Sequence, residues 1–74
     1  MITYFELIDQ ENRGIIVKYN GSKGYTYDKN HKKWVRDGIM MDYFMADVYD
    51  ESPKSSDDYR EISEDEALEK LGLN

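Results

Sequence analysis

The sequence contains no cysteine, and it has one proline, one tryptophan and one histidine among its 74 residues. Without cysteine, the chain has no disulfide and no thiolate metal site, which fits a reducing compartment. No apolar run approaches the roughly 18 residues of a membrane-spanning helix. The first residues, MITYFELIDQ, lack the basic region and the small-residue cleavage site of a signal peptide. We therefore expect a cytoplasmic protein that makes no contact with a membrane.

Residues suited to catalysis are also scarce. There is no cysteine nucleophile, and the single histidine, His31, falls in an expected turn among lysines, where nothing is expected to orient or desolvate it. The loop NGSKG at 20–24 lacks the length and the final Gly-Lys-Ser/Thr of a phosphate-binding P-loop. We therefore predict that the protein is not an enzyme, that it has no catalytic residue, and that it binds no cofactor.

Acidic residues are plentiful, but their spacing does not match a metal site. Five of them lie in or near the segment 50–61: Asp50, Glu51, Asp57, Asp58 and Glu61. Their pattern differs from the calcium-binding EF-hand loop, which also needs a glycine at its sharp turn. A solvated acidic loop explains these residues better, and we predict no metal site.

Aromatic residues make up 14% of the chain and include seven tyrosines. Disordered chains are poor in aromatic residues, so the chain is expected to fold although 35% of its residues are charged. Its length suits a single domain spanning 1–74. Such a short chain buries only roughly 60% of its unfolded surface, so we expect marginal stability.

Short runs of β-branched and aromatic residues indicate strands at 2–8, 15–20, 25–28 and 33–37. The pair Asn20-Gly21 is a strong hairpin signal between the second and third runs. These four runs predict an antiparallel meander of three or four strands. The run at 59–62 is a further short strand in this interpretation.

Two helices are expected after the meander. Between 38 and 50, apolar residues recur on one helical face, namely Met40, Met41, Phe44, Met45 and Val48. Asp37 is positioned to cap the start of this helix. A second helix is expected to begin at Ser63, which forms a capping box with Glu66, and to end at Gly72 in the left-handed conformation.

The sequence thus predicts an α+β fold, in which a small antiparallel sheet of three to five strands carries two short helices packed on one face. The expected core consists of apolar residues from every element: Phe5, Leu7, Ile15, Val17, Trp34, Phe44, Met45, Val48, Ile62, Leu68 and Leu71.

Charge is distributed unevenly along the chain, whose net charge is −6. Residues 13–36 carry seven Lys and Arg against one acid, whereas residues 37–74 carry three against twelve acids. Such asymmetry can mark an interaction face. Alternatively, the two halves attract each other, either within the fold or in a head-to-tail dimer.

Two features are candidate partner surfaces. The first is the basic hairpin, where Tyr25, Tyr27 and Trp34 alternate with lysine and arginine, and the second is the methionine-rich helix. The candidate residues are Met40, Met41, Tyr43, Lys32, Lys33 and Arg36. Core packing is the alternative for the methionines, and an ordinary solvated hairpin is the alternative for the cations. Nucleic-acid binding needs exposed aromatics and a favourable overall field, so the acidic half argues against it.

The order Y-x-Y-D, K-W-V-x-D, D-Y-F and Y-x-E-I-S-E-x-E-A spans about the C-terminal two thirds of the chain. It resembles a group of small uncharacterised proteins of Gram-positive bacteria and their mobile elements. The residues that carry the resemblance are Tyr25, Tyr27, Asp28, Trp34, Asp37, Tyr43, Glu61, Ile62, Ser63, Glu64, Glu66 and Ala67. The resemblance implies no activity, cofactor or partner.

We therefore hypothesise a non-enzymatic cytosolic module that binds another protein, as a monomer or a weak homodimer. The alternative is an acidic inhibitor or immunity-type protein from a phage or mobile element, which blocks a basic nuclease or DNA-binding surface. Direct binding of nucleic acid through the hairpin ranks third.

Overall fold

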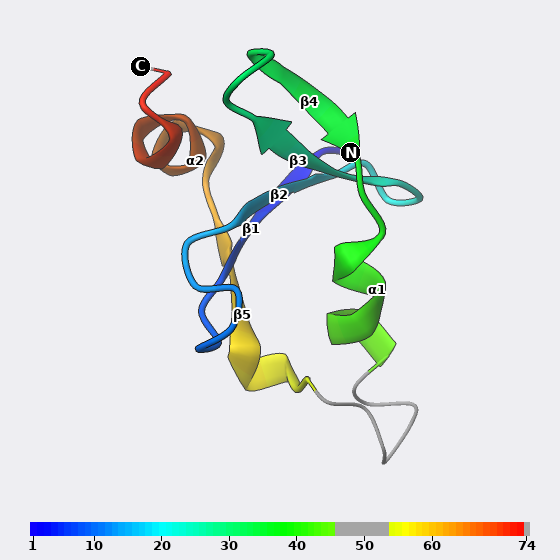
Figure 1. Cartoon of the computed structure of the whole chain (residues 1–74). Coiled ribbons are helices and arrows are strands. Elements are labelled where there is room, and N and C mark those ends of the chain that lie inside the picture. Colours follow the sequence, from blue (N-terminus) through cyan, green and yellow to red (C-terminus); the bar gives the residue numbers. More distant parts are fainter. Residues whose placement is uncertain (46–53, 74) are drawn as a thin grey trace.

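The computed structural model describes residues 1–45 and 54–73 and contains one five-stranded antiparallel sheet with two α-helices (Figure 1). The α+β fold class predicted from the sequence is confirmed. In chain order the elements are β1 (Thr3–Leu7), β2 (Ile16–Tyr19), β3 (Gly24–Asp28), β4 (Lys33–Arg36), α1 (Ile39–Phe44), the 3-10 helix η2 (Ser56–Asp58), β5 (Tyr59–Ile62) and α2 (Glu64–Leu71). No helix in the described ranges is long and apolar enough to cross a membrane.

The sheet has the strand order β4-β3-β2-β1-β5. The first four strands form the expected meander, and β5 returns to pair with β1. At the first turn, Gly14 has a φ of 94° and donates its N–H to the carbonyl of Leu7 at 2.9 Å. Leu7 in turn donates to Ile15 at 2.9 Å, which is the hydrogen-bond pattern of a bulge with a left-handed glycine.

The second turn confirms the Asn-Gly signal. Gly21 has a φ of 94°, and the side-chain oxygen of Asn20 accepts the backbone N–H groups of Ser22 and Lys23 at 2.9 and 2.7 Å. These bonds hold the turn together and fix the register in which Val17 faces Thr26.

The two helices lie on opposite faces of the sheet, so the predicted packing of both on one face is wrong (Figure 1). Neighbouring residues of a strand point to opposite faces. Ile16 packs with Ala67 of α2, whereas Val17 packs with Met40 and Tyr43 of α1. Because β1 and β2 carry apolar side chains on both faces, each face needs its own helix to cover it.

The core therefore consists of two clusters rather than one. The buried residues are Tyr4, Ile16, Ile62 and Ala67 on the α2 side, and Leu7, Val17, Met40 and Tyr43 on the α1 side. Of the predicted core, Leu7, Val17 and Ile62 are buried. Those that are only half-buried are Phe5, Ile15, Trp34, Phe44, Met45, Leu68 and Leu71. The prediction for Val48 lies outside the described residues.

At the start of α1, the carboxylate of Asp37 accepts the backbone N–H of Ile39 at 3.0 Å. The expected contact is therefore present, although the backbone places Gly38 at the cap position. The predicted continuation of this helix to residue 50 extends beyond the described residues.

The Ser63 cap and the Gly72 end of α2 are confirmed, whereas the reciprocal bond of the predicted capping box, from the backbone N–H of Ser63 to the Glu66 side chain, is not formed. Ser63 accepts the backbone N–H of Glu66 at 3.1 Å, and Gly72 has a φ of 75°. Leu73 donates its N–H to the carbonyl of Leu68 at 2.8 Å, which closes the helix. The carboxylate of Glu66 binds Arg60 at 2.6 Å, so this side chain ties the helix to β5.

Candidate interaction surface

The β3–β4 hairpin forms one edge of the sheet, because within residues 1–45 and 54–73 β4 pairs with β3 alone (Figure 1). Along β4, Lys33, Val35 and Arg36 are exposed, and Val35 retains 39% of its accessible surface. Lys32 precedes the strand in a left-handed conformation with a φ of 55°. The chain therefore presents an open strand edge with a cation near each end.

The hairpin aromatics contribute to packing on the α2 side of the sheet. The ring centre of Trp34 lies 5.4 Å from that of Tyr27 and 6.1 Å from that of Tyr4. The ammonium of Lys18 lies 5.5 Å from the Trp34 ring centre, within the range of a cation–π contact. Trp34 is thus half-buried among neighbours from β1, β2 and β3.

The hairpin cations differ from those of the acidic half in their partners. Within the described residues, no ion pair is formed by Lys29, Lys32, Lys33 or Arg36. The three cations of the acidic half are all paired, and Lys54 lies 2.7 Å from Asp9. The guanidinium of Arg60 lies 2.7 Å from Glu6 and 2.6 Å from Glu66, and Lys70 lies 3.3 Å from Glu6.

The edge strands of the two charged regions lie on opposite sides of the sheet, with β4 at one edge and β5 at the other. The exposed acids in β5 and on α2 are Glu61, Glu64, Asp65 and Glu69. Within the described residues, no ion pair joins a cation of 13–36 to an acid of 37–74.

His31 is oriented by a neighbour, contrary to the sequence-based expectation. Its Nδ1 lies 2.7 Å from Oδ2 of Asp28, and the other carboxylate oxygen accepts the backbone N–H groups of Asn30 and His31. The bond to His31 lowers the pKa of the Asp28 carboxyl below its usual range. Because the imidazole remains exposed, this arrangement closes the hairpin turn and makes no enclosed site.

The methionine-rich helix provides little surface. Met40 and Tyr43 retain only 2% and 1% of their accessible surface, so both are core residues and cannot contact a partner. Their side chains fill the space between α1 and the sheet, where Leu7 and Val17 also lie. Met41, on the opposite side of the helix, is 46% exposed. Of the six candidate residues, the structure thus leaves Met41 and the three hairpin cations at the surface.

A polar network that the sequence did not suggest joins the β1–β2 loop to α1. The hydroxyl of Tyr43 donates to Asp9 at 2.7 Å and accepts from the side-chain amide of Asn12 at 2.9 Å. Lys54 donates to the other oxygen of Asp9 at 2.7 Å and to Glu11 at 3.0 Å. No sequence pattern indicates these contacts, because 45 residues separate Asp9 from Lys54.

The pKa shifts in this network keep Asp9, Lys54 and Tyr43 in their usual charge states at neutral pH. The hydrogen bond from Lys54 lowers the pKa of Asp9, and the bonds to Asp9 and Glu11 raise the pKa of Lys54. Burial, with the bond to Asp9, raises the pKa of Tyr43. A general acid or base works best with a pKa near the operating pH. All three shifts move away from neutrality, so the network is suited to holding segments together.

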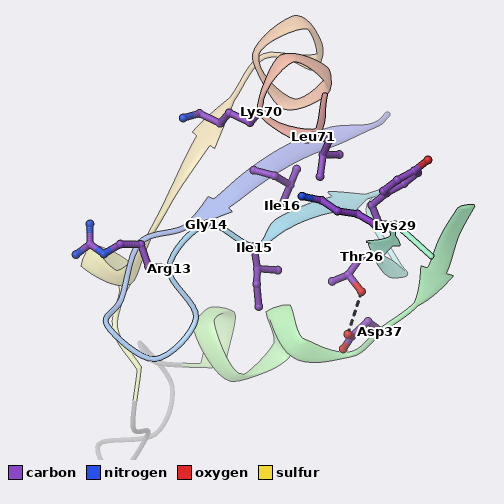
Figure 2. A pocket seen from close by; sticks show the side chains of 10 residues that line it. Arg13, Gly14, Ile15, Ile16, Thr26, Lys29, Asp37, Lys70 and Leu71 are labelled. Carbon is purple, nitrogen blue, oxygen red and sulfur yellow. Dashed lines mark hydrogen bonds between the residues drawn. The ribbon is translucent and has the colours of Figure 1, made fainter. Parts of the chain in front are cut away.

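An open cleft of about 430 Å³ lies where the pairing of β2 with β3 ends (Figure 2). Its lining includes Ile15 and Ile16, and Figure 2 shows the side chain of Lys29, in the turn after β3, extending over it. At one side, Thr26 donates a hydrogen bond to Asp37 at 3.2 Å. The cleft extends the basic region of the hairpin toward β2.

Comparisons with protein-family models, curated proteins and solved structures find no significant match to this chain. They do not bear on the resemblance to small proteins of Gram-positive bacteria, which stays a prediction.

Proposed function

We propose that the protein is a non-enzymatic, cytoplasmic protein-binding module whose docking surface is the outer edge of the β3–β4 hairpin. One observation carries this proposal. The hairpin cations Lys32, Lys33 and Arg36 have no ion-pair partner among the described residues, and they flank a strand whose outer edge is open. Extended segments of partner proteins add to such edges through main-chain hydrogen bonds, and nearby charges select the partner.

Other features of the described residues support a binding role over catalysis. Two of the titratable groups with a shifted pKa, Asp9 and Lys54, belong to an ion pair that keeps both charged at neutral pH. The oriented histidine, His31, is exposed in a turn rather than enclosed. Neither group is positioned to exchange a proton with a substrate in an enclosed site.

A second candidate function rests on the opposite edge. The exposed acids Glu61, Glu64, Asp65 and Glu69 support an acidic inhibitor that covers a basic nuclease or DNA-binding surface. Direct nucleic-acid binding is less favoured, because Trp34 is packed against Tyr4 and Tyr27.

Affinity capture from a bacterial lysate separates these functions. The bait is the full chain, compared with a hairpin variant (Lys32→Glu, Lys33→Glu and Arg36→Glu) and an acid-edge variant (Glu64→Lys and Glu69→Lys). Each capture is done with and without nuclease treatment.

We expect a protein that survives nuclease treatment, is lost with the hairpin variant and is retained by the acid-edge variant. Loss with the acid-edge variant alone would instead support the inhibitor. Capture that disappears on nuclease treatment would indicate nucleic acid and contradict the proposal.

A further inference from the structure

We propose that the outer edge of β4 accepts a second copy of this chain, which adds its own β5 as the next strand, so that copies join head to tail. This inference rests on the proposed function, because it assigns an occupant to the same hairpin edge. It accounts for both charged regions of the molecule with a single contact.

Charge complementarity identifies β5 as the matching edge. The hairpin segment 29–36 carries four cations and no acid, whereas the segment 57–65 carries five acids and one cation, Arg60. That guanidinium is already held by Glu6 and Glu66 at 2.7 and 2.6 Å, so it does not repel an approaching hairpin. Four positive charges therefore face a segment whose net charge is −4.

The charges on the two edge strands, such as Lys33 and Glu61, cannot meet within one molecule. Four inter-strand steps separate β4 from β5, which at about 4.8 Å each places the edges about 19 Å apart. The Debye length at physiological ionic strength is about 8 Å, so attraction across the sheet is largely screened. A second copy brings the two edges to adjacent-strand distance without changing the fold.

The side-chain faces also match. A row of paired residues crosses the sheet from Glu61 through Phe5, Val17 and Thr26 to Val35. Lys33 projects from the same face as Val35, two residues earlier in β4. If the sheet of one copy continues into the next, β4 of the first copy and β5 of the second run in the same direction. Lys33 of the first copy then lies on the same face of the sheet as Glu61 of the second.

The same charges disfavour the competing arrangement. Pairing β4 with β4 of another copy brings the cations of both copies onto adjacent strands, where like charges are destabilising. Lysine on an edge strand is a common device against such pairing. Head-to-tail addition meets no such penalty, because the β5 edge has the opposite sign.

The test measures the mass of the full chain in solution by analytical ultracentrifugation, over a concentration series at low salt and at 1 M salt. We expect the wild-type mass to rise above the 8.8 kDa of one copy at low salt. It should return to that value at 1 M salt, where the Debye length is about 3 Å. A wild-type chain that stays monomeric throughout at low salt would overturn the inference.

A pair of charge reversals at exposed positions tests the direction of assembly. Lys33→Glu reduces the net charge of the segment 29–36 from +4 to +2, and Glu61→Lys reduces that of the segment 57–65 from −4 to −2. Each variant alone also places like charges at positions 33 and 61 of neighbouring copies, so each should associate more weakly than the wild type. Their mixture should associate more strongly than either variant, because positions 33 and 61 then carry opposite charges at every contact. If Glu61→Lys associates as the wild type does, or if the mixture associates no more strongly than either variant, head-to-tail pairing is wrong.

A proline substitution tests for main-chain pairing at this edge. The N–H of Asp37 bonds inward to the carbonyl of Gly24 at 2.9 Å, so the N–H of the preceding residue, Arg36, points outward. Arg36→Pro removes that outward donor and leaves the inward bonds in place. It should therefore weaken association more than the charge-matched control Arg36→Thr, and equal effects would contradict strand pairing.

Failure of this inference is distinguishable from failure of the proposed function. If the chain is monomeric but still captures a protein through the hairpin, the second copy is not the occupant, and the hairpin edge is still a docking edge. A chain that associates and captures no other protein keeps the second copy as the occupant of the edge and contradicts the proposed capture of a separate partner.

Discussion

The hydroxyl of Tyr43 lies 2.7 Å from the carboxylate of Asp9, although the two residues are 34 positions apart in the sequence. Tyr43 belongs to α1, and Asp9 to the loop between β1 and β2. The contact fixes the only α-helix on its side of the sheet within the described residues, because α2 covers the opposite face. The stability of that side should therefore depend on this hydrogen bond.

We expect Tyr43→Phe to lower the free energy of unfolding by about 1–3 kcal/mol, because the amide of Asn12 loses its acceptor and Asp9 loses a donor near the core. The aromatic ring is retained in this variant, so its packing between α1 and the sheet is unchanged. Urea unfolding monitored by circular dichroism measures the effect. Tyr25→Phe is the matched control, because its hydroxyl bonds to no other described residue. Equal stability of the two variants would contradict the role of this bond.

The network also predicts a dependence on acid. The bond from Lys54 holds the pKa of Asp9 below its value in the unfolded chain, about 3.9. The stability that this shift contributes is present above the unfolded pKa and is lost as the pH falls through the folded pKa. In Asp9→Asn, the free energy of unfolding should fall less steeply than in the wild type between about pH 5 and pH 2. Unfolding by urea at several pH values tests this, and parallel curves would contradict it.

The C-terminal helix should depend on its cap. We expect Ser63→Ala to destabilise the protein by about 0.5–2 kcal/mol and Ser63→Gly by less, because the N–H of Glu66 loses its acceptor. The lowered melting temperature should be visible in a thermal scan. Ser56→Ala is the control, because that side chain has no bond to a described residue. A melting temperature of Ser63→Ala equal to that of the control would show that the cap contributes nothing.

Trp34→Ala should leave the protein folded but less stable. Full burial predicts a loss of about 3–5 kcal/mol, and the half-buried ring should lose less than that. Circular dichroism during urea unfolding measures the loss. Val35→Ala, on the exposed face of the same strand, should have a smaller effect. Complete unfolding of Trp34→Ala would show that the ring holds the hairpin in place.

Local signals predicted most of the secondary structure. The Asn20-Gly21 turn, the Ser63 cap and the left-handed Gly72 each depend on a few neighbouring residues, so their conformations follow from short-range chemistry. The placement of the helices was not predictable in this way. Ile16 and Val17 are both apolar, and an uninterrupted apolar run does not show which face a distant helix will cover.

The candidate surface was predictable only in part. Charges on the hairpin stayed at the surface, as solvated cations do, whereas Met40 and Tyr43 became buried because α1 faces the sheet through them. The pairing of Asp9 with Lys54 depends on how the chain folds back over 45 residues, and no local pattern carries that information.

The outer edge of β4 must accept a protein strand if the proposed function and the head-to-tail assembly are both correct. Amide hydrogen exchange of the wild-type chain, followed by NMR in dilute and in concentrated solution, tests this directly. The N–H groups of Trp34 and Arg36 point outward, so they should exchange quickly in dilute solution and become protected as the concentration rises. The N–H of Val35, which points inward to β3, should be protected in both. If the N–H groups of Trp34 and Arg36 exchange equally fast at every concentration and in the presence of any captured partner, the outer edge of β4 is not a docking edge.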